Sequence, residues 1–427
     1  MNVSARSILA FAALAALPVG CRAADDIVVW QRSASETVLY DARPELGIGM
    51  HAFTPQQVAL LKPLGIRFVR LTLYWNQMEP AAEGQYAPDY LKAWDGHVRL
   101  AGEQGVELVA VVHAPPPGLD WAHKEQAYER FARFMAAMAK RYPSVRYWEL
   151  FNEMDGAFTD LFGANEKGLG MLERGKLYAR MLKLAYPAIR TANPSAWVLT
   201  GGMTDFQEFP RGIYEGGGKE YFDILAIHTY GVPVTWSFID RGKTVREIMR
   251  SYGDGDKPLW NTEFGIDGGN VIAAWGYPHA EKPPRDDAQV LDQTQLDQWR
   301  ECIEWNARNR LYQKILPYQL AAGNERDDAE GKIKERIKLP AGRTIDDYGF
   351  GILRADGKAP RPTYDWIART QPNAAIRARP KLKSDVTFNP IFGALPAGAA
   401  PVQWHSQATI KGAEVDSRAP TRLAPAR

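Results

Sequence analysis

The stretch VRYWELFNEMD (residues 145–155) begins as an apolar, aromatic run typical of a buried β-strand and ends in an amide and a carboxylate, Asn152 and Glu153. Seven other apolar runs occur along the chain, and several are nearly continuous, as expected of parallel strands covered on both faces. These runs lie at residues 46–50, 66–73, 106–113, 196–202, 222–228, 257–264 and 314–320. The stretch therefore predicts one strand of a large parallel sheet.

Segments with apolar residues at helical spacing separate these runs, for example EQAYERFARFMAAMAKRY (125–142). Eight strands that alternate with helices predict an α/β fold, a (β/α)8 TIM barrel, over residues 44–370. The alternative is an open doubly wound sheet, which usually carries a glycine-rich phosphate loop after its first strand. LGIGMHAF (46–53) contains no GxGxxG, so the barrel is favoured.

The two ends of the chain differ from this pattern. Arg6 precedes the apolar run ILAFAALAALPVG (8–20), which is shorter than the roughly 20 residues that cross a bilayer. It predicts a signal peptide over residues 1–23 and a periplasmic or secreted protein. A lipidated Cys21 is the alternative, and it alone would attach the protein to a membrane. Residues 371–427 hold 8 Lys and Arg against 3 Asp and Glu, and predict a basic Pro- and Ala-rich tail, partly disordered, or a small β appendage.

Composition and missing motifs exclude several classes of protein. With 52 basic and 50 acidic residues the net charge is +2, which gives no reason to expect a nucleic-acid partner. The chain has no HExxH, no His-x-His and no paired CxxC, so we expect neither a protein-bound metal nor a cofactor. It also lacks a GxSxG elbow. After signal cleavage Cys302 is the one cysteine, in a helical pattern, and we expect it in the core. A hydrolase run by carboxylates fits what remains.

Two glutamates supply such carboxylates. Glu153 ends the fourth apolar run and Glu263 lies near the end of the seventh. Catalytic groups of a (β/α)8 barrel lie at the carboxyl ends of its strands, where strands four and seven can face each other. One glutamate at a strand end is more often a surface or ion-paired residue. A pair that converges there is what glycosidic cleavage requires, one acid for the leaving oxygen and one nucleophile or base for the anomeric carbon.

Other polar residues are candidates for support. Arg70, in the second run, and Tyr230, after the sixth, are expected beside the carboxylate of Glu263. Arg70 could equally neutralise Glu149 inside the barrel, because buried charges are usually paired. Asn152 is expected to donate to a sugar hydroxyl. Neighbouring residues of a regular strand point to opposite faces, so the strand must end or bulge at Asn152 for it and the next residue to reach one ligand.

Several aromatic and histidine positions leave two interpretations open. His113 and His228 each end a strand, and each could contact sugar or be a hydrogen-bonded core histidine. The chain has 13 tryptophans, whose rings suit the apolar faces of sugars as well as large cores. Trp75 could form the floor of a subsite or cap the barrel, whereas Trp260 is expected to pack against helices.

The motifs WELFNE (148–153) and WNTEFG (260–265) together resemble the retaining glycoside hydrolases of clan A. The second run, continued as FVRLTLYWNQMEPAAEGQYAPDYLKAWD (68–95), and the segment FGILRADGKAPRPTYDWIA (350–368) extend the resemblance over about residues 44–370. Within the clan the chain looks similar to family 39, which includes β-xylosidases, α-L-iduronidases and endoglycosidases of bacterial exopolysaccharide clusters.

The resemblance implies roles for individual residues. It makes Glu153 the acid/base and Glu263 the nucleophile, and the positions that match the family's subsites are those of Arg70, Asn152, His228 and Tyr230. Many clan members carry a tryptophan at the end of strand eight. This sequence has ILPYQL (315–320) there, which offers Tyr318 or Gln319 to the substrate.

The sequence therefore predicts a retaining glycoside hydrolase that cleaves a poly- or oligosaccharide, with a bacterial exopolysaccharide as its expected substrate, through a covalent glycosyl-enzyme intermediate. A non-catalytic polysaccharide-binding or assembly protein is one alternative, although a binder gains nothing from two repelling acids held close together. A transglycosidase is the other. It would use the same intermediate, with a sugar in place of water, and the sequence does not separate it from a hydrolase.

Overall fold

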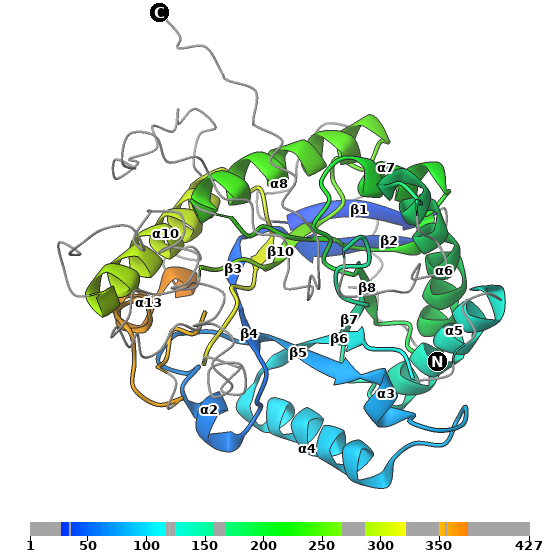
Figure 1. Cartoon of the computed structure of the whole chain (residues 1–427), viewed down its shortest axis with the longest axis horizontal. Helices are drawn as coiled ribbons and strands as arrows, with labels where there is room; N and C mark the ends of the chain where they lie inside the picture. The colour runs from blue at the N-terminus through cyan, green and yellow to red at the C-terminus, as the bar shows by residue number, and fades with distance from the viewer. Residues whose placement is uncertain are drawn as a thin grey trace, which may run out of the picture.

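The computed structural model describes residues 27–33, 36–116, 119, 124–156, 168–231, 233–266, 287–321, 350–354 and 357–374 (Figure 1). The expected signal peptide and the expected tail beyond residue 374 lie outside these ranges. None of the helices in the described part of the chain combines the length and the apolar character that a bilayer crossing needs.

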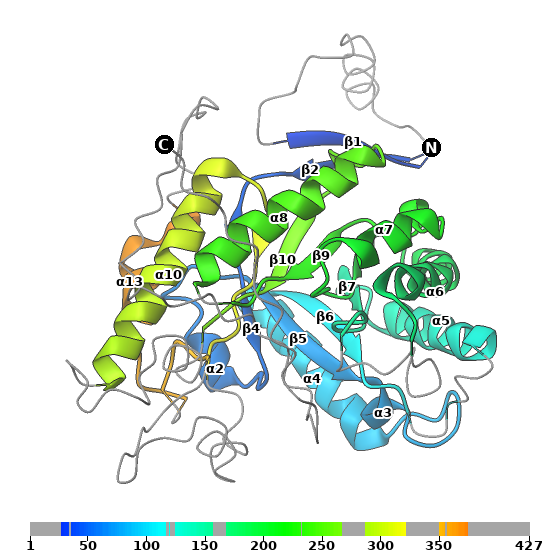
Figure 2. The same ribbon diagram turned by 45° about the horizontal axis from the view of Figure 1, so that its top comes forward.

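Eight parallel strand positions form a closed ring. The barrel strands lie at the centre of the molecule, inside the helices (Figure 2). The first position consists of two short pieces, β3 (Glu45–Leu46) and β4 (Ile48–Met50). The others are β5 (Phe68–Tyr74), β6 (Glu107–His113), β7 (Tyr147–Leu150), β8 (Trp197–Thr200), β9 (Leu225–His228), β10 (Leu259–Glu263) and β11 (Lys314–Ile315). Because β11 pairs with β3, and a bridge between Leu199 and Ile224 joins the β8 and β9 sides, the ring closes. The predicted (β/α)8 barrel is confirmed.

Helices follow the strands and surround the ring (Figure 1). They are α2 (Pro55–Ala59), α3 (Trp75–Met78), α4 (Pro88–Gln104), α5 (Lys124–Arg141), α6 (Met171–Ala192), α7 (Glu208–Glu215), the 3-10 turn η2 (Lys219–Tyr221), α8 (Val234–Ser251), α10 (Asp287–Asn309) and α13 (Pro362–Thr370). Local chemistry sets several ends. Pro88 opens α4, where a missing N–H costs nothing, and Gly105 closes it at a φ of 65°. Cys302 on α10 is fully buried, as expected.

The interior of the barrel near the amino-terminal ends of its strands is filled by a separate apolar layer. It consists of Phe68, Val109, Leu199, Ile224, Ala226, Trp260 and Leu316, with Tyr147 and Trp197 packed against it. The ring of Trp260 lies 5.1 Å from Tyr147 and 6.2 Å from Phe68. The expectation that Trp260 packs against helices is therefore wrong: its side chain points into the barrel and forms part of the floor below the polar site.

A hairpin that the sequence analysis did not predict precedes the barrel. Strands β1 (Ile27–Ser33) and β2 (Glu36–Asp41) pair antiparallel. The guanidinium of Arg32 lies 4.3 Å from the ring centre of Trp197, the first residue of β8, and forms an ion pair with Asp223 at 2.9 Å. The hydroxyl of Tyr40 donates to the carbonyl of Asp256, just before β10. The hairpin thus lies against the amino-terminal ends of β8 to β10.

Candidate active site

The carboxylates of Glu153 and Glu263 lie at the opposite end of the barrel, where the strands finish. Strand β7 ends at Leu150, and Phe151 and Glu153 then adopt left-handed backbone angles, with φ of 68° and 49°. The amide of Glu153 donates to the carbonyl of Gly202 after β8, at 3.0 Å. The predicted end of the strand at Asn152 is confirmed, and this turn aims Asn152 and Glu153 toward the barrel mouth.

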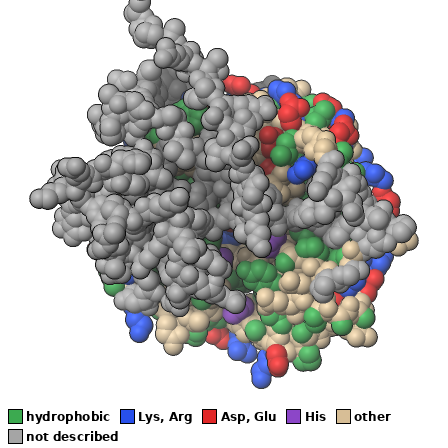
Figure 3. Space-filling view, in the orientation of Figure 1, with side chains coloured by type: hydrophobic (Ala, Val, Ile, Leu, Met, Phe, Trp, Pro, Cys, Tyr) green, Lys and Arg blue, Asp and Glu red, His purple; other side chains and the backbone are tan. Residues whose placement is uncertain are grey.

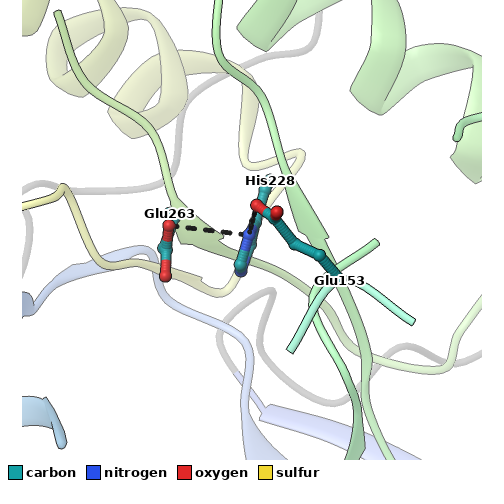
Figure 4. Close-up of side chains that lie close together, drawn as sticks. All are labelled: Glu153, His228 and Glu263. Carbon is teal, nitrogen blue, oxygen red and sulfur yellow. Dashed lines mark hydrogen bonds and ion pairs between the residues drawn. The ribbon is translucent and has the colours of Figure 1, made fainter. Parts of the chain in front are cut away.

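His228, the last residue of β9, lies between the two glutamates (Figure 4). Its Nδ1 is 2.8 Å from Oε1 of Glu153 and 3.6 Å from Oε2 of Glu263. One oxygen of each carboxylate and one ring nitrogen of His228 all lie within 4.8 Å of one another. All three side chains are buried. The two carboxyl groups that the sequence paired are therefore direct neighbours in space.

Arg70 of β5 contacts both of the partners between which the sequence left the choice open. Its guanidinium donates to both oxygens of Glu149, at 2.8 and 3.0 Å, and also forms a hydrogen-bonded ion pair with Glu263. It donates to Oδ1 of Asn152 at 2.7 Å as well. The hydroxyl of Tyr230 donates to the second oxygen of Glu263 at 2.6 Å. Both oxygens of Glu263 are thus held by donors.

These surroundings shift the pKa values of the two glutamates in opposite directions. Burial and the negative charge of Glu263 raise the pKa of Glu153, against the lowering effect of the His228 contact. Burial alone would also raise the pKa of Glu263, but the charges of His228 and Arg70 and the Tyr230 hydroxyl lower it below its ordinary value. Glu153 therefore favours its protonated form and Glu263 its ionised form.

His228 carries a charge of its own in this arrangement. Burial alone lowers its pKa, but the charge of Glu263, the nearby Glu149 carboxylate and the hydrogen bond with Glu153 raise it to about 9. A protonated imidazole donates from Nδ1 to Oε1 of Glu153. The other oxygen of that carboxyl, Oε2, is buried and has no hydrogen-bond partner among the described residues. That oxygen is the position from which a proton can leave.

Glu149 is a further charged residue of this cluster, which the sequence analysis named only as a possible partner of Arg70. It is fully buried on β7 and accepts hydrogen bonds from the Gly202 amide at 2.9 Å and from the Thr262 hydroxyl at 3.1 Å. Burial raises its pKa, but the Arg70 charge and the His228 contact outweigh this and lower the pKa to about 2. A charged residue in the middle of the otherwise apolar run WELF was the signal for it.

The mouth of the barrel beside Glu263 is lined by His113 and Tyr318. His113 ends β6 and is half-buried, its Nδ1 has no partner among the described residues, and burial together with the Arg70 charge lowers its pKa to about 4. The Tyr318 hydroxyl is hydrogen-bonded to Nε2 of His51, and the two rings meet edge to face at 5.3 Å. Figure 3 shows histidine side chains around a hollow near the middle of this face. His51, directly after the first strand, was not predicted.

Trp75 lies away from this cluster. Its side chain is fully buried between Phe131 and Phe134, with ring centres 5.3 Å from each, and its indole N–H donates to Glu79 at 3.1 Å. A ring enclosed in this way has no free face for a sugar. The structure thus corrects the prediction that Trp75 contacts substrate and places it in the aromatic packing outside the strands.

Within the described residues, the one set of side chains whose atoms could jointly hold a cation is the same trio of Glu153, His228 and Glu263. In the structure these atoms already have partners of complementary charge, namely His228 for both carboxylates and Arg70 for Glu263. The arrangement can donate a proton from one carboxyl and present the other as an ionised nucleophile.

Comparison with known proteins points the same way. The family model described as "Cellulase (glycosyl hydrolase family 5)" matches residues 43–310. Among curated proteins, the 6-phospho-beta-galactosidase of Streptococcus mutans is 24% identical over 133 residues, which is 30% of this chain and 28% of that protein. The match thus spans less than a third of the length of this relative.

Solved structures share the fold at low identity. A family 39 glycoside hydrolase from Bacteroides cellulosilyticus WH2 superposes with a TM-score of 0.55 at 19% identity, over 80% of this chain and 68% of the other. An exo-beta-1,4-mannosidase from Opitutaceae bacterium strain TAV5 gives 0.52 at 15% identity, over 83% and 63%. The predicted resemblance to clan A is confirmed, but family 39 within the clan is not, since the matching model is that of family 5.

Proposed function

Because the chain belongs to the cellulase family, glycosyl hydrolase family 5, we propose that it hydrolyses O-glycosidic bonds with retention of configuration at the anomeric carbon. The observation that carries this proposal is the pair Glu153 and Glu263, with oxygens within 4.8 Å of each other and pKa values shifted apart. Retaining enzymes hold their carboxyl groups about 5–5.5 Å apart, whereas inverting enzymes need about 6.5–9.5 Å to admit a water.

In the first step, ionised Glu263 attacks the anomeric carbon while Glu153 donates its proton to the leaving oxygen. The bond to the leaving group breaks as the bond from Glu263 to the sugar forms, and an ester-linked glycosyl enzyme results. In the second step, Glu153, now ionised, takes a proton from water as that water attacks the anomeric carbon and releases Glu263. Each glutamate ends the cycle as it began.

The neighbouring side chains support these roles. When Glu153 is protonated, the positive charges of Arg70 and His228 match the negative charges of Glu149 and Glu263, so the buried cluster is neutral overall. Proton donation leaves a new negative charge on Glu153, which the imidazolium beside it at 2.8 Å stabilises. The Tyr230 hydroxyl and Arg70 hold Glu263 ionised and oriented.

We propose a poly- or oligosaccharide as the substrate, and a bacterial exopolysaccharide in particular. Asn152, His113 and Tyr318 at the barrel mouth provide polar and aromatic surface of the kind that binds sugars. Export to the periplasm or the medium, which the N-terminal sequence supports, would bring the enzyme to such a polymer. Mass spectrometry of the mature chain tests the export. A start at Ala24 is expected, whereas a lipidated Cys21 at the N-terminus would mean that the protein is attached to a membrane.

Trapping of the intermediate tests the retaining mechanism. A 2-deoxy-2-fluoroglycoside with an activated leaving group, matched to a sugar that the enzyme cleaves, should add one sugar mass to the peptide that contains Glu263. Proton NMR of the first product should show the anomer of the substrate. The variant Glu263→Gln is the matched control, since it should bind glycan but neither turn over nor become labelled.

Three outcomes would contradict parts of the proposal. The opposite anomer as first product would indicate inversion. Sugar-to-sugar transfer at low acceptor concentration, with little hydrolysis, would indicate a transglycosidase. Binding without cleavage of any glycan in a broad panel would indicate a binding protein.

A further inference from the structure

Asp155 lies two residues after Glu153 and has no part in the mechanism described above. Its side chain is 1% exposed, and its Oδ2 accepts from the Thr204 amide at 2.7 Å, from the Thr204 hydroxyl at 3.2 Å and from the Asp205 amide. Its Oδ1 is buried without a hydrogen-bond partner among the described residues. One carboxyl oxygen thus gathers three donors from the loop after β8.

The turn that Asp155 anchors is the one that carries the proton donor. Glu153 adopts a left-handed φ of 49°, which a side chain with a Cβ rarely takes without outside support. Two backbone bonds hold this turn: the Glu153 amide donates to the Gly202 carbonyl at 3.0 Å, and the Gly156 amide donates to the Glu153 carbonyl at 2.9 Å. The side chain of Asp155 adds hydrogen bonds between the same two segments, the turn after β7 and the loop after β8.

The loop after β8, to which Asp155 is hydrogen-bonded, also contacts the backbone of His228, the residue whose side chain is hydrogen-bonded to Glu153. The Met203 amide donates to the Ala226 carbonyl at 3.3 Å, and the Met203 carbonyl accepts from the His228 amide at 2.9 Å. Residues 202–205 therefore connect the backbone of Glu153 to the backbone of His228. The 2.8 Å contact between the two side chains depends on how these loops are joined.

We propose that Asp155 is a positioning residue for the proton donor: by clamping the Glu153 turn to the loop after β8, it holds the Glu153 carboxyl against His228 in the orientation that protonates the leaving oxygen. This inference rests on the proposed function, because it assigns Asp155 a role in one half of that reaction. Misplacement of a reacting group by about 1 Å can reduce a rate by about 10²-fold.

The variants Asp155→Ala and Asp155→Asn separate the clamp from the negative charge. Alanine removes the acceptor for all three donors, whereas asparagine keeps an oxygen in the place of Oδ2. Both should be assayed on two glycosides of one sugar, one whose leaving group needs protonation and one whose leaving group departs without it. Asp155→Ala should reduce kcat/KM by about 10²-fold on the first and far less on the second. Asp155→Asn should restore most of the loss.

Asp205→Ala is the matched control, since it alters the same loop without removing the clamp. The Oδ1 of Asp205 accepts from the Gln207 and Phe209 amides, at 3.2 and 2.7 Å, and so caps the start of α7. The Asp205→Ala variant should have a lower thermal stability, and its kcat/KM should change by the same factor on both glycosides. An equal loss on both glycosides in Asp155→Ala would make Asp155 merely structural, and full activity in that variant would also overturn the inference.

Amide hydrogen exchange tests the clamp without any assay of activity. The Glu153 and Gly156 amides should exchange faster in Asp155→Ala than in the wild type, and at the wild-type rate in Asp155→Asn. Unchanged exchange in the alanine variant would overturn the inference. If the wild type cleaved no glycoside, the proposed function would fail, and this exchange measurement would still decide whether Asp155 holds the turn.

Discussion

Arg70 forms ion pairs with two carboxylates of the site, those of Glu149 and Glu263. It is 6% exposed and lies between two carboxylates that are themselves buried. Removing one partner of a buried ion pair leaves an uncompensated charge, at a cost of about 3–5 kcal/mol. Glu149 therefore has two effects: it stabilises the fold through Arg70, and it keeps Arg70 in place for the nucleophile.

The pH dependence of stability should reveal this role of Glu149. Its pKa falls from 4.5 to about 2 on folding, so the folded state releases this proton more readily than the unfolded state does. The pair thus stabilises the protein above pH 4.5, by about 3 kcal/mol from the shift, and this contribution disappears as the pH falls toward 2. Urea unfolding of Glu149→Gln and wild type should differ by about 3 kcal/mol at pH 7.

The two unfolding curves should then converge as the pH decreases. The amide side chain of the Glu149→Gln variant keeps a carbonyl oxygen that can accept from the Gly202 amide, so the comparison isolates the charge. A difference that stayed constant from pH 7 to pH 3 would mean that the variant loses packing and not the ion pair.

Glu153→Ala should show the signature of a missing proton donor. General acid catalysis contributes about 10²–10⁴-fold, so kcat/KM should fall by that order on a glycoside with a poor leaving group and much less on an activated one. In the wild type the raised pKa of Glu153 keeps its proton to a higher pH than an ordinary glutamate would, and kcat/KM should fall as the pH rises through that pKa. The variant should lack this alkaline decline on the activated substrate. Persistence of the decline would assign it to another group, such as His228.

Sequence reasoning paired the two glutamates that the structure brings together, but it did not find all the side chains that hold them. Glu153 and Glu263 could be predicted because strand ends are visible as the limits of apolar runs. The clamp by Asp155 could not, because two of its three donors are backbone amides of a loop some fifty residues away, and a sequence does not show where backbone amides point. The prediction for Trp75 was wrong because a tryptophan directly after a strand can line the barrel mouth or pack against the helices, and the sequence is the same in both cases.

At the scale of secondary-structure elements, the barrel strands were recognisable because they are largely buried on both faces and several are therefore almost continuously apolar. The β1–β2 hairpin was not recognised. An isolated two-stranded hairpin is marginal in water, so only its packing against the barrel makes it stable. That packing depends on residues far apart in the sequence, such as Arg32 with Trp197 and Asp223.

Arg32→Met should therefore destabilise the protein without impairing catalysis. Arg32 and Asp223 are 4% and 0% exposed, and the variant leaves the Asp223 carboxylate buried without its counter-charge. We expect a loss of about 3 kcal/mol in the free energy of unfolding. Because the hairpin contacts the strand starts and the catalytic groups lie at the strand ends, kcat/KM should remain unchanged at a temperature where the variant is folded.

Arg99→Met is the matched control for this experiment. Arg99 pairs with Glu103 on α4 at 3.8 Å, but the two side chains are 74% and 59% exposed. Exposed pairs of this kind contribute about 0.3–0.5 kcal/mol, so this variant should unfold close to the wild type. If Arg32→Met behaved in the same way, the hairpin would not be part of the stable core.

At the scale of the whole molecule, the two ends of the barrel differ: one contributes packing and stability, and the other holds the charged site. The amino-terminal end holds the apolar layer around Trp260 and the hairpin that packs on it, whereas the carboxyl end holds the buried charges around Arg70, His228 and the two paired glutamates. This division follows from the closed ring, because its interior is filled with side chains and one end alone remains for substrate. The cost of burying this cluster of charges can then be tolerated, since the remainder of the barrel supplies stability.

Such a barrel should unfold as one unit, and Cys302 offers a probe of this. Its side chain is fully buried on α10, and burial raises the pKa of its thiol well above the ordinary value. A thiol reagent should therefore label it only through opening of the fold. In a Cys21→Ala chain, the free energy derived from labelling should match that from tryptophan fluorescence, on the order of 5–15 kcal/mol, with the same denaturant slope. A shallower slope for labelling would show instead that α10 opens locally while the rest of the barrel stays folded.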